Sequence, residues 1–429
     1  MVAAIVGSGR TVGTPLVSVV TPSYNQGRFI RATIESVLSQ NYPELEYIVM
    51  DGGSTDETST IVREYASRLV FISKPDRGQS HAINEGFRLA KGSVLAWINS
   101  DDVFLPGAVS AAVRALNCDP EAGLVYGDGY VIDALGDITG PFPHTREPDL
   151  WRLVYLSDYI LQQSVFFRRE VLDDVGYLDE ALHYGLDWDL FIRIGLKYRL
   201  VYLPKYLGCL REYPETKSSS GGIKRIRELH AILRKHTGLS LPPGSTVYGL
   251  DTYADLACRE IRLRTPPRAR SLGNLLEQAV RFVAGHVIHH TLQHAQGLYP
   301  DGWAGVRLQY MFPSGCRSVL MEGSVPDWLH GQSLQVECNA RRLGKYDFAA
   351  GKFKLEIAIP SDLTGEPIHL RIVARRWFLT SFFPWRADCR RLAYKVDCVR
   401  GLEFRGDQPP LSSNPPRPLS RETSEKSLP

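Results

Sequence analysis

Acidic side chains occur together at two places in this chain where they could bind a metal or accept a proton. The first is Trp97-Ile-Asn-Ser-Asp-Asp102, in which an apolar run leads directly into Asn99, Asp101 and Asp102. Adjacent carboxylates repel each other unless a cation lies between them. Carboxylate oxygens suit Mg²⁺ or Mn²⁺, which commonly bridge one or two carboxylates to a substrate's phosphates. The alternative is a solvated turn in which Asp102 helps to cap the next helix.

The second place is the segment Tyr184-Gly-Leu-Asp-Trp-Asp-Leu-Phe-Ile-Arg193. As a helix, it would bury its aromatic and aliphatic side chains on one side and pair Asp189 with Arg193, four residues later. Asp187 stands at the start of this helix, before the buried face begins. It is either an N-cap residue or a carboxylate directed into a cleft, where it could act as a general base.

Two polar segments nearer the N-terminus could hold a nucleotide. Thr21-Pro-Ser-Tyr-Asn25 offers an aromatic ring and short polar groups beside which a base could lie, and Asp51 could accept a hydrogen bond from that base. The segment that Asp51 opens also has the composition of a turn and a helix cap. We interpret Ser54 and Glu57 as a capping box, which leaves Asp51 free.

Alternating strands and helices must position these residues. Short β-branched runs predict strands, and apolar residues at helical spacing predict the helices between them. The expected strands are 16–21, 47–50, 69–72 and 94–98. Such alternation indicates an α/β fold with a Rossmann-like, mostly parallel sheet and flanking helices. Ligands of such sheets bind beyond the carboxyl ends of the strands, where the polar segments 21–25, 51–56, 74–79 and 99–102 lie.

Changes of pattern along the chain predict five parts. Apolar residues alternate with polar ones after residue 302, as in Lys352–Ile359, which indicates a small antiparallel β-sandwich. The predicted parts are an N-terminal extension (1–14), an α/β catalytic domain (15–240), a helical connector (241–298), a β-sandwich accessory domain (299–405) and a disordered tail (406–429).

Composition limits the class of protein. Of 429 residues, 44% are hydrophobic and 23% are charged, as in ordinary globular proteins. The formal charge of +3 is too close to balance to indicate nucleic-acid binding. The chain has no run of about 18 apolar residues, and we do not expect its first residues to be a secretory signal. Its cysteine count, seven, is odd, and no CxxC pair occurs. We therefore expect a cytoplasmic protein with reduced thiols that binds no nucleic acid.

Six motifs, in this order, resemble the family 2 inverting glycosyltransferases of the GT-A fold. The resemblance covers roughly 16–235, about half of the chain. The motifs are VSVVTPSYNQG (17–27), VMDGGSTDET (49–58), KPDRGQSHAINEG (74–86), WINSDD (97–102), QQSVFF (162–167) and YGLDWDLFIRI (184–194).

This resemblance implies a reaction and its participants. A single sugar would pass with inversion from a nucleotide-diphosphate sugar (UDP-, dTDP- or GDP-linked) to a hydroxyl of a glycan or lipid-linked acceptor, in surface polysaccharide or glycan synthesis. Mg²⁺ or Mn²⁺ would be the cofactor. The implied roles are nucleotide binding for Thr21, Tyr24 and Asp51, binding of the sugar-nucleotide for Asp76, ribose and metal binding for Asp101, metal binding for Asp102, and general base for Asp187.

The sequence departs from the family pattern at two positions. Asn99 stands where relatives often have Asp, and Tyr213 stands where they often have a His. Tyr is a poor neutral ligand for Mg²⁺, so these departures concern the completeness of the metal site. The QxxRW motif of processive polysaccharide synthases is absent after Asp187, which favours transfer of a single sugar.

The residues leave open two other functions, carbohydrate binding and nucleotidyl transfer, and a contact with the membrane surface. The chain could be a non-catalytic carbohydrate-binding protein, in which Trp303, Trp328, Trp377 or Trp385 of the β-domain stacks on sugars. We expect most of these residues in the sandwich core or against the catalytic domain. A sugar-nucleotide nucleotidyltransferase should carry a basic phosphate loop, which Thr21–Gly27 lacks. Five arginines between Arg259 and Arg270 could make a peripheral contact at the inner face of the membrane. We favour a solvated connector there, because Pro266-Pro267 interrupts any long amphipathic helix.

Overall fold

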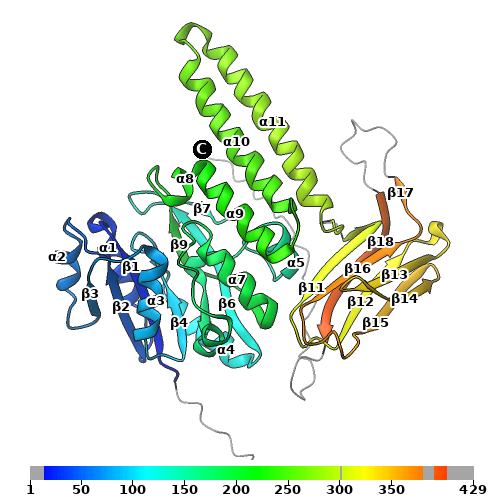
Figure 1. The fold of residues 1–429 in the computed structure, drawn as a ribbon, viewed down its shortest axis with the longest axis horizontal. Coiled ribbons are helices and arrows are strands. Elements are labelled where there is room, and N and C mark those ends of the chain that lie inside the picture. The colour runs from blue at the N-terminus through cyan, green and yellow to red at the C-terminus, as the bar shows by residue number, and fades with distance from the viewer. Residues whose placement is uncertain (1–13, 300–301, 380–390, 403–429) are drawn as a thin grey trace, which may run out of the picture.

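The computed structural model describes residues 14–299, 302–379 and 391–402 (Figure 1). Along the chain, an α/β region is followed by two long helices and then by a β-sandwich. This arrangement confirms the predicted fold class. The predicted extension, up to residue 13, and the predicted tail at 406–429 lie outside the described residues.

A nine-stranded sheet forms the centre of the α/β region, in the order β3-β2-β1-β4-β8-β6-β9-β5, with β7 paired to β6. Pairing is parallel from β3 to β4 and between β6 and β9, and antiparallel where β8, β7 and β5 join. The strands are β1 Val17–Ser23, β2 Leu45–Asp51, β3 Val70–Ser73, β4 Val94–Trp97, β5 Val103–Phe104, β6 Ala122–Ile132, β7 Ile138–Pro141, β8 Phe166–Arg168 and β9 Arg199–Arg211. Because the four strands β1, β2, β3 and β4 are parallel, their carboxyl ends lie at the same edge of the sheet.

Helices cover both faces of this sheet. Consecutive residues of β1 point to opposite faces, so Val19 lies in one apolar cluster, with Ile34 and Val109, and Val20 lies in the other, with Phe87. The helices are α1 Gly27–Leu38, α2 Thr58–Arg63, α3 Gln79–Leu89, α4 Ala108–Cys118, α5 Leu150–Tyr155, α6 Arg169–Val175, α7 Leu186–Lys197, α8 Lys217–Ser220 and α9 Gly222–Thr237.

The predicted capping box at the start of the second helix is wrong. Helix α2 begins at Thr58, and Ser54 is not its N-cap. Asp56 instead accepts hydrogen bonds from the backbone N–H of Thr58, at 3.0 Å, and of Gly27 at the start of α1, at 2.9 Å. The Ser54 hydroxyl donates to Asp51. Asp56 therefore connects the loop before α2 to the start of α1. The spacing of residues within one segment does not reveal such a contact between two segments.

The connector forms two long antiparallel helices, α10 (Pro243–Arg264) and α11 (Arg270–His294). They project from the α/β region, with Pro266 in the turn at their far end (Figure 1). Proline is compatible with a helix start, and Pro243 is the first residue of α10. No helix in the described ranges is long and apolar enough to cross a membrane.

Two antiparallel sheets form the predicted β-sandwich. One has the order β10-β18-β12-β15, with β17 paired to β18, and the other has the order β11-β16-β13-β14. Their inward-facing side chains, such as Val319, Leu334 and Ile372, form one apolar core. The strands are β10 Trp303–Gly305, β11 Arg307–Phe312, β12 Ser318–Val325, β13 Gln332–Cys338, β14 Arg341–Phe348, β15 Gly351–Ala358, β16 Ile368–Ala374, β17 Phe378–Leu379 and β18 Arg391–Leu402.

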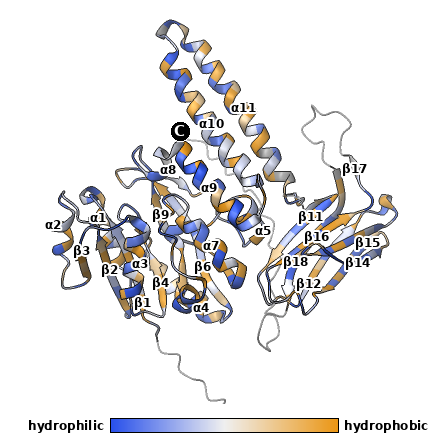
Figure 2. Ribbon diagram, in the orientation of Figure 1, coloured by the Kyte–Doolittle hydropathy of each residue, from blue (hydrophilic) through white to orange (hydrophobic). Residues whose placement is uncertain are grey.

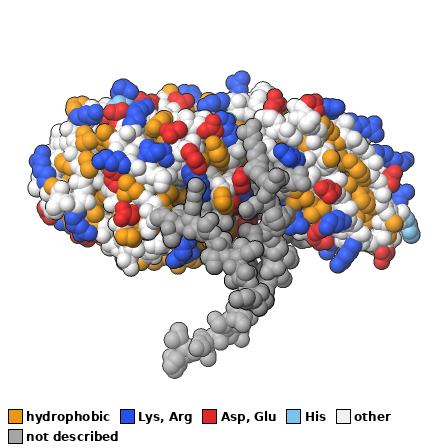
Figure 3. All heavy atoms as spheres, turned by 90° about the horizontal axis from the view of Figure 1, so that it is seen from below, with side chains coloured by type: hydrophobic (Ala, Val, Ile, Leu, Met, Phe, Trp, Pro, Cys, Tyr) orange, Lys and Arg blue, Asp and Glu red, His pale blue; other side chains and the backbone are white. Residues whose placement is uncertain are grey.

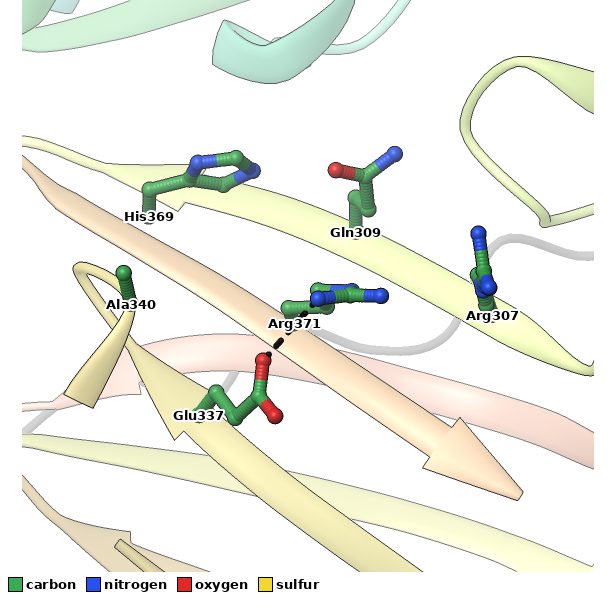
Figure 4. A pocket seen from close by; sticks show the side chains of 6 residues that line it. All are labelled: Arg307, Gln309, Glu337, Ala340, His369 and Arg371. Atoms are coloured by element: carbon green, nitrogen blue, oxygen red, sulfur yellow. Dashed lines mark hydrogen bonds and ion pairs between the residues drawn. The ribbon is translucent and has the colours of Figure 1, made fainter. Parts of the chain in front are cut away.

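The β-sandwich packs against α5 and carries a hollow on that side. The ring of His369 lies 5.5 Å from the ring of Tyr155. The hollow has a volume of about 360 Å³, and Arg371 pairs with Glu337 at 3.1 Å on its wall (Figure 4). The expectation that most Trp residues of this domain are in its core is wrong for Trp328 and Trp377, which are 53% and 42% exposed.

Candidate active site

The loops after β1, β2, β3 and β4 meet at one edge of the sheet. The carbonyl of Ser23 accepts a hydrogen bond from the N–H of Gly52 at 2.8 Å. A Cβ atom on Gly52 would stand 2.8 Å from Oδ2 of Asp76, so the loop after β3 packs directly on the loop after β2. Gln79, at the start of α3, donates to Oδ1 of Asn99 at 2.7 Å. The predicted polar segments therefore form one continuous surface.

The three predicted nucleotide-binding residues differ in accessibility. Tyr24 is 61% exposed and presents its ring to solvent. Thr21 is fully buried, and its hydroxyl lies 3.0 Å from that of Tyr47. Asp51 is also buried, and its Oδ2 accepts hydrogen bonds from the N–H of Ser54 at 3.1 Å and the hydroxyl of Ser73 at 2.6 Å. Asp51 thus holds this turn in shape, and Tyr24 has the accessible side chain.

Asp102 is buried beneath the site and linked to β9 and to the 3₁₀ turn Gln162–Ser164. Its Oδ1 accepts a hydrogen bond from the N–H of Arg211 at 2.8 Å. Its Oδ2 accepts hydrogen bonds from Asn99 at 3.0 Å and Gln163 at 2.6 Å. Burial, followed by the charge of Asp101, raises the pKa of Asp102 to about 8. In this structure Asp102 fixes the acidic motif to its neighbours, and an amide at position 99 supplies a donor that Asp would lack.

Asp101 lies above Asp102 and contacts the residue at the expected His position. Its Oδ2 accepts a hydrogen bond from the Tyr213 hydroxyl at 2.9 Å, and its backbone carbonyl accepts one from Arg211 Nε at 2.6 Å. Burial raises the pKa of the Asp101 carboxyl. Burial and the charge of Asp101 also raise the pKa of Tyr213, so its phenol stays protonated and donates. Tyr213 therefore orients Asp101.

The residues present suit a metal ion that takes few protein ligands. Among the residues that the structure describes, no group of three or more His, Cys, Asp or Glu side chains could hold a metal. Mg²⁺ is often bound through one or two carboxylates together with substrate phosphates. Asp101 fits that role. The carboxylate oxygens of Asp102 already accept three hydrogen bonds, so its role as a ligand stays a prediction.

Asp187 lies in the first turn of α7, whose N-cap is Gly185. The N-cap alternative for Asp187 is therefore wrong. Its Oδ1 accepts a hydrogen bond from the N–H of Trp188 at 2.9 Å. Burial raises the pKa of Asp187, and the positive charges of Lys217 and Arg225 act in the opposite direction. A carboxylate with a raised pKa is a better proton acceptor than an ordinary exposed Asp.

A second carboxylate, Asp158, lies close enough to Asp187 for the two charges to interact. Burial, followed by the charge of Asp187, raises the pKa of Asp158 well above its ordinary value. The backbone N–H of Asp158 donates to the hydroxyl of Tyr248 on α10 at 3.3 Å, and the Tyr248 ring lies 5.3 Å from that of Trp188. No motif marks Asp158 in the sequence, so it is not among the predicted site residues. The structure adds it to the candidate site.

Lys217, the first residue of α8, connects the start of α3 to the loop before α7. Its Nζ donates to Oε1 of Gln79 at 2.6 Å and to the carbonyl of His183 at 3.0 Å. Burial lowers the pKa of Lys217, and the charges of Asp187, Glu228 and Asp101 oppose this effect. The ammonium group is thus near both Asp101 and Asp187. Sequence reasoning missed Lys217 as well, since its neighbours form no recognisable motif.

Glu228 on α9 positions the loop that leads into α7. Its carboxylate accepts hydrogen bonds from the N–H groups of His183, Tyr184 and Gly185, at 2.9, 2.5 and 2.8 Å. A Cβ atom on Gly185 would stand 2.6 Å from Ile232, so α9 packs closely on this loop. Glu228 therefore fixes the backbone two residues before Asp187.

Replacing Glu228 with Gln should loosen this loop. The amide keeps one acceptor oxygen but loses the charge, and a hydrogen bond to a charged group contributes about 1.5–3 kcal/mol. We expect a loss of roughly 2 kcal/mol in the free energy of unfolding and a lower kcat. Thermal unfolding and steady-state kinetics measure both. Glu121→Gln, at an exposed glutamate, is the control, and equal behaviour of the two variants would refute the positioning role.

Behind the site, Asp189 joins α7 to α9. It is fully buried and contacts Arg193 at 2.8 Å, as the helical spacing predicts. Lys235 and His236 of α9 contact its other oxygen at 2.9 and 2.8 Å. Burial alone would raise the pKa of Asp189, but the hydrogen bonds from His236 and Lys235 and the charge of Arg193 lower it. This carboxylate is therefore held in its charged form.

Carboxylates thus lie at the strand ends of the α/β sheet and in the first turn of α7. The family model of glycosyl transferase family 2 matches residues 18–176. The chain is 30% identical over 187 residues to a PGL/p-HBAD biosynthesis glycosyltransferase of Mycobacterium tuberculosis, which covers 42% of this chain and 70% of that protein. The chain belongs to glycosyl transferase family 2.

Other relatives match the same part of the chain. An uncharacterized glycosyltransferase of Rickettsia prowazekii, RP339, is 30% identical over 190 residues, which are 43% of this chain and 60% of that protein. The O-antigen biosynthesis protein RfbC of Myxococcus xanthus is 32% identical over 42% of this chain and 14% of that protein. The chain therefore spans less than two thirds of the length of several relatives.

Solved structures show a more distant similarity. The mannosyltransferase PcManGT of Pyrobaculum calidifontis, in complex with GDP-Man and Mn²⁺, has a TM-score of 0.44 and 20% identity, over 66% of this chain and 85% of that chain. Residues 1–349 of S. aureus TarS, in complex with UDP, give a TM-score of 0.41 and 18% identity, over 59% of this chain and 77% of that chain.

Proposed function

We propose that this protein transfers a single sugar from a nucleotide-diphosphate sugar to an acceptor hydroxyl, with inversion at the anomeric carbon. The donor would be UDP-, dTDP- or GDP-linked. The acceptor would be a glycan or a lipid-linked sugar in surface polysaccharide or glycolipid synthesis, the setting that the names of two relatives indicate. The reaction would take place in the cytoplasm.

One observation carries this proposal. Lys217 Nζ donates to Gln79 at 2.6 Å, and Gln79 donates to Asn99 of the first acidic motif at 2.7 Å. Lys217 Nζ also donates at 3.0 Å to the carbonyl of His183, in the loop that leads to Asp187, so it connects the two acidic motifs. These motifs are 86 residues apart in sequence. On the nucleotide side, Ser23 Oγ at the end of β1 is buried and, in the described part of the chain, has no hydrogen-bond partner, which suits contact with a ligand.

The side chains suggest how the transfer would proceed. Asp187 takes the proton of the acceptor hydroxyl while its oxygen bonds to the anomeric carbon, on the face opposite the nucleotide diphosphate. The bond from that carbon to the phosphate oxygen breaks, so the configuration inverts. Mg²⁺ or Mn²⁺, held by Asp101 and the donor phosphates, would neutralise charge on the leaving group. Lys217 supplies further positive charge between the donor and acceptor sides.

Ligand-dependent thermal unfolding tests the proposal directly. The full chain is heated with UDP, dTDP, GDP and their sugars, each with and without Mn²⁺. A ligand at about 100 times its Kd should raise the free energy of unfolding by roughly 2.7 kcal/mol. We expect one nucleotide diphosphate to stabilise the protein, and Mn²⁺ to increase the effect. The Tyr24→Ala variant, which removes the accessible ring, should reduce it.

Two outcomes would contradict the proposal. If no nucleotide stabilises the protein but oligosaccharides do, the carbohydrate-binding alternative is correct. If a nucleotide stabilises it but, with pyrophosphate added, the nucleotide-diphosphate sugar is converted into a nucleoside triphosphate and a sugar 1-phosphate, the nucleotidyltransferase alternative is correct.

A further inference from the structure

Helix α11 exposes an apolar stripe that no other described element covers. Apolar side chains recur along it at intervals of three and four residues, the spacing of one helix face. Phe282 is 75% exposed and Leu275 is 61% exposed. The exposed apolar residues of the stripe are Leu272, Leu275, Leu276, Ala279, Phe282, Val283 and Val287. We call this set the α11 stripe.

The α11 stripe is not the face that holds the two helices together. Helix α11 packs on α10, and Gly273 and Ala284 of α11 are buried. Cys258 of α10 is buried as well, and its Sγ contacts the backbone carbonyl of Glu277 at 3.8 Å. Soluble helices normally turn their apolar stripe inward. Here the side chains of the α11 stripe are exposed, and orange apolar residues recur along the length of α11 in Figure 2.

Positive charge accompanies the stripe at the far end of the hairpin. Five arginines lie between residues 259 and 270. Arg262 pairs with Glu277 at 2.8 Å and Arg264 with Glu260 at 2.9 Å. Arg268 and Arg270 in the turn are exposed, and Leu263 beside them is 76% exposed. On the face of the molecule opposite the hairpin, by contrast, basic and acidic side chains are interspersed (Figure 3).

We propose that the end of the α10–α11 hairpin and the α11 stripe bind the surface of a membrane that contains anionic lipids. Exposed apolar side chains next to arginines are the combination by which amphipathic helices bind at the headgroup boundary. No described helix is apolar enough to span the bilayer, so the contact lies at the surface. A second copy of the chain fits less well, because it would present the same exposed Arg268 and Arg270.

Pro266 and Pro267 are the reason to predict a solvated connector from the sequence. In the structure, they do not prevent the two long helices from forming. Pro266 lies in the turn between two intact helices of 22 and 25 residues, instead of breaking one helix. Tyr248, near the base of α10, contacts Asp158 beside the candidate base. Eighteen residues separate Tyr248 from this turn, which is about 27 Å of helix. This inference rests on the proposed function. If the turn binds the membrane surface, α10 connects that surface to the acceptor side of the site, where a lipid-linked acceptor would bind.

Vesicle flotation tests the membrane proposal without any assay of activity. The full chain is mixed with vesicles of phosphatidylcholine, alone or with phosphatidylglycerol. We expect binding to the anionic vesicles, weaker binding to neutral ones, and loss of the difference at high salt. Arg268→Gln with Arg270→Gln should weaken partitioning to anionic vesicles roughly 30-fold, from about 1 kcal/mol for each basic residue near the surface.

A second pair of substitutions tests the apolar contact. Leu275→Ser with Phe282→Ser should abolish flotation with both kinds of vesicle. Leu135→Ser is the matched control, since Leu135 is 83% exposed but lies between β6 and β7. All variants change exposed side chains and should unfold at the temperature of the wild type. Absence of flotation by the wild type, or equal loss in the control, would overturn the proposal. The proposal would also be overturned if sedimentation showed the wild type to be a dimer and the Leu275→Ser with Phe282→Ser variant alone to be a monomer.

Discussion

Replacement of Asp187 by Asn is expected to lower kcat by roughly 10²–10⁴-fold, the usual contribution of a positioned general base. Asn has nearly the same shape and still accepts the hydrogen bond from the N–H of Trp188, so α7 should begin unchanged. It cannot accept a proton from the acceptor. Donor binding should therefore be retained, and the thermal shift with the nucleotide should equal that of the wild type.

The pH profile of kcat gives a second measurement of the same role. Burial raises the pKa of Asp187, so activity should fall, as pH is lowered, at a pH above the ordinary Asp value of about 3.9. The charge of Lys217 lowers this pKa, so Lys217→Met should move the acidic limb to higher pH. Normal turnover by Asp187→Asn would show that another group, with Asp158 the nearest candidate, is the base.

Replacement of Asp189 by Asn is expected to lower the free energy of unfolding by about 3–5 kcal/mol, as when one partner of a buried ion pair is removed. Asp189 is fully buried and is the shared partner of Arg193, Lys235 and His236. The variant leaves these groups without their counter-charge between α7 and α9. Denaturant unfolding at neutral pH measures the loss.

The same substitution at an exposed pair provides the control. Asp174 pairs with Lys197 at 3.1 Å, and both side chains are nearly half exposed, so Asp174→Asn should cost about 1 kcal/mol or less. The pKa of Asp189 is lowered on folding, so its contribution is present above the unfolded pKa and decreases as pH falls towards the folded value. The difference between the wild type and Asp189→Asn should therefore shrink in acid. A loss below 1 kcal/mol at neutral pH would refute the proposed role of Asp189.

The sequence alone indicated where chemistry could occur, because the relevant patterns are local. Apolar runs that end in Asp51 and Asp101 predicted strands with polar ends, and helical spacing predicted the Asp189–Arg193 pair. Alternation of strands and helices then required a sheet whose carboxyl ends meet. The period of two after residue 302 predicted the β-sandwich in the same way. These signals depend only on residues that are close in sequence.

The tertiary structure decided what those residues contact. Asp102 accepts a hydrogen bond from the backbone of Arg211, which is 109 positions away, and Tyr213 reaches Asp101 across a similar separation. Lys217 and Asp158 join the site from segments that carry no motif. The direction of the α11 stripe depends on which face of α11 packs on α10. Such contacts depend on how whole helices and strands pack together. Patterns among residues that are close in sequence do not predict them.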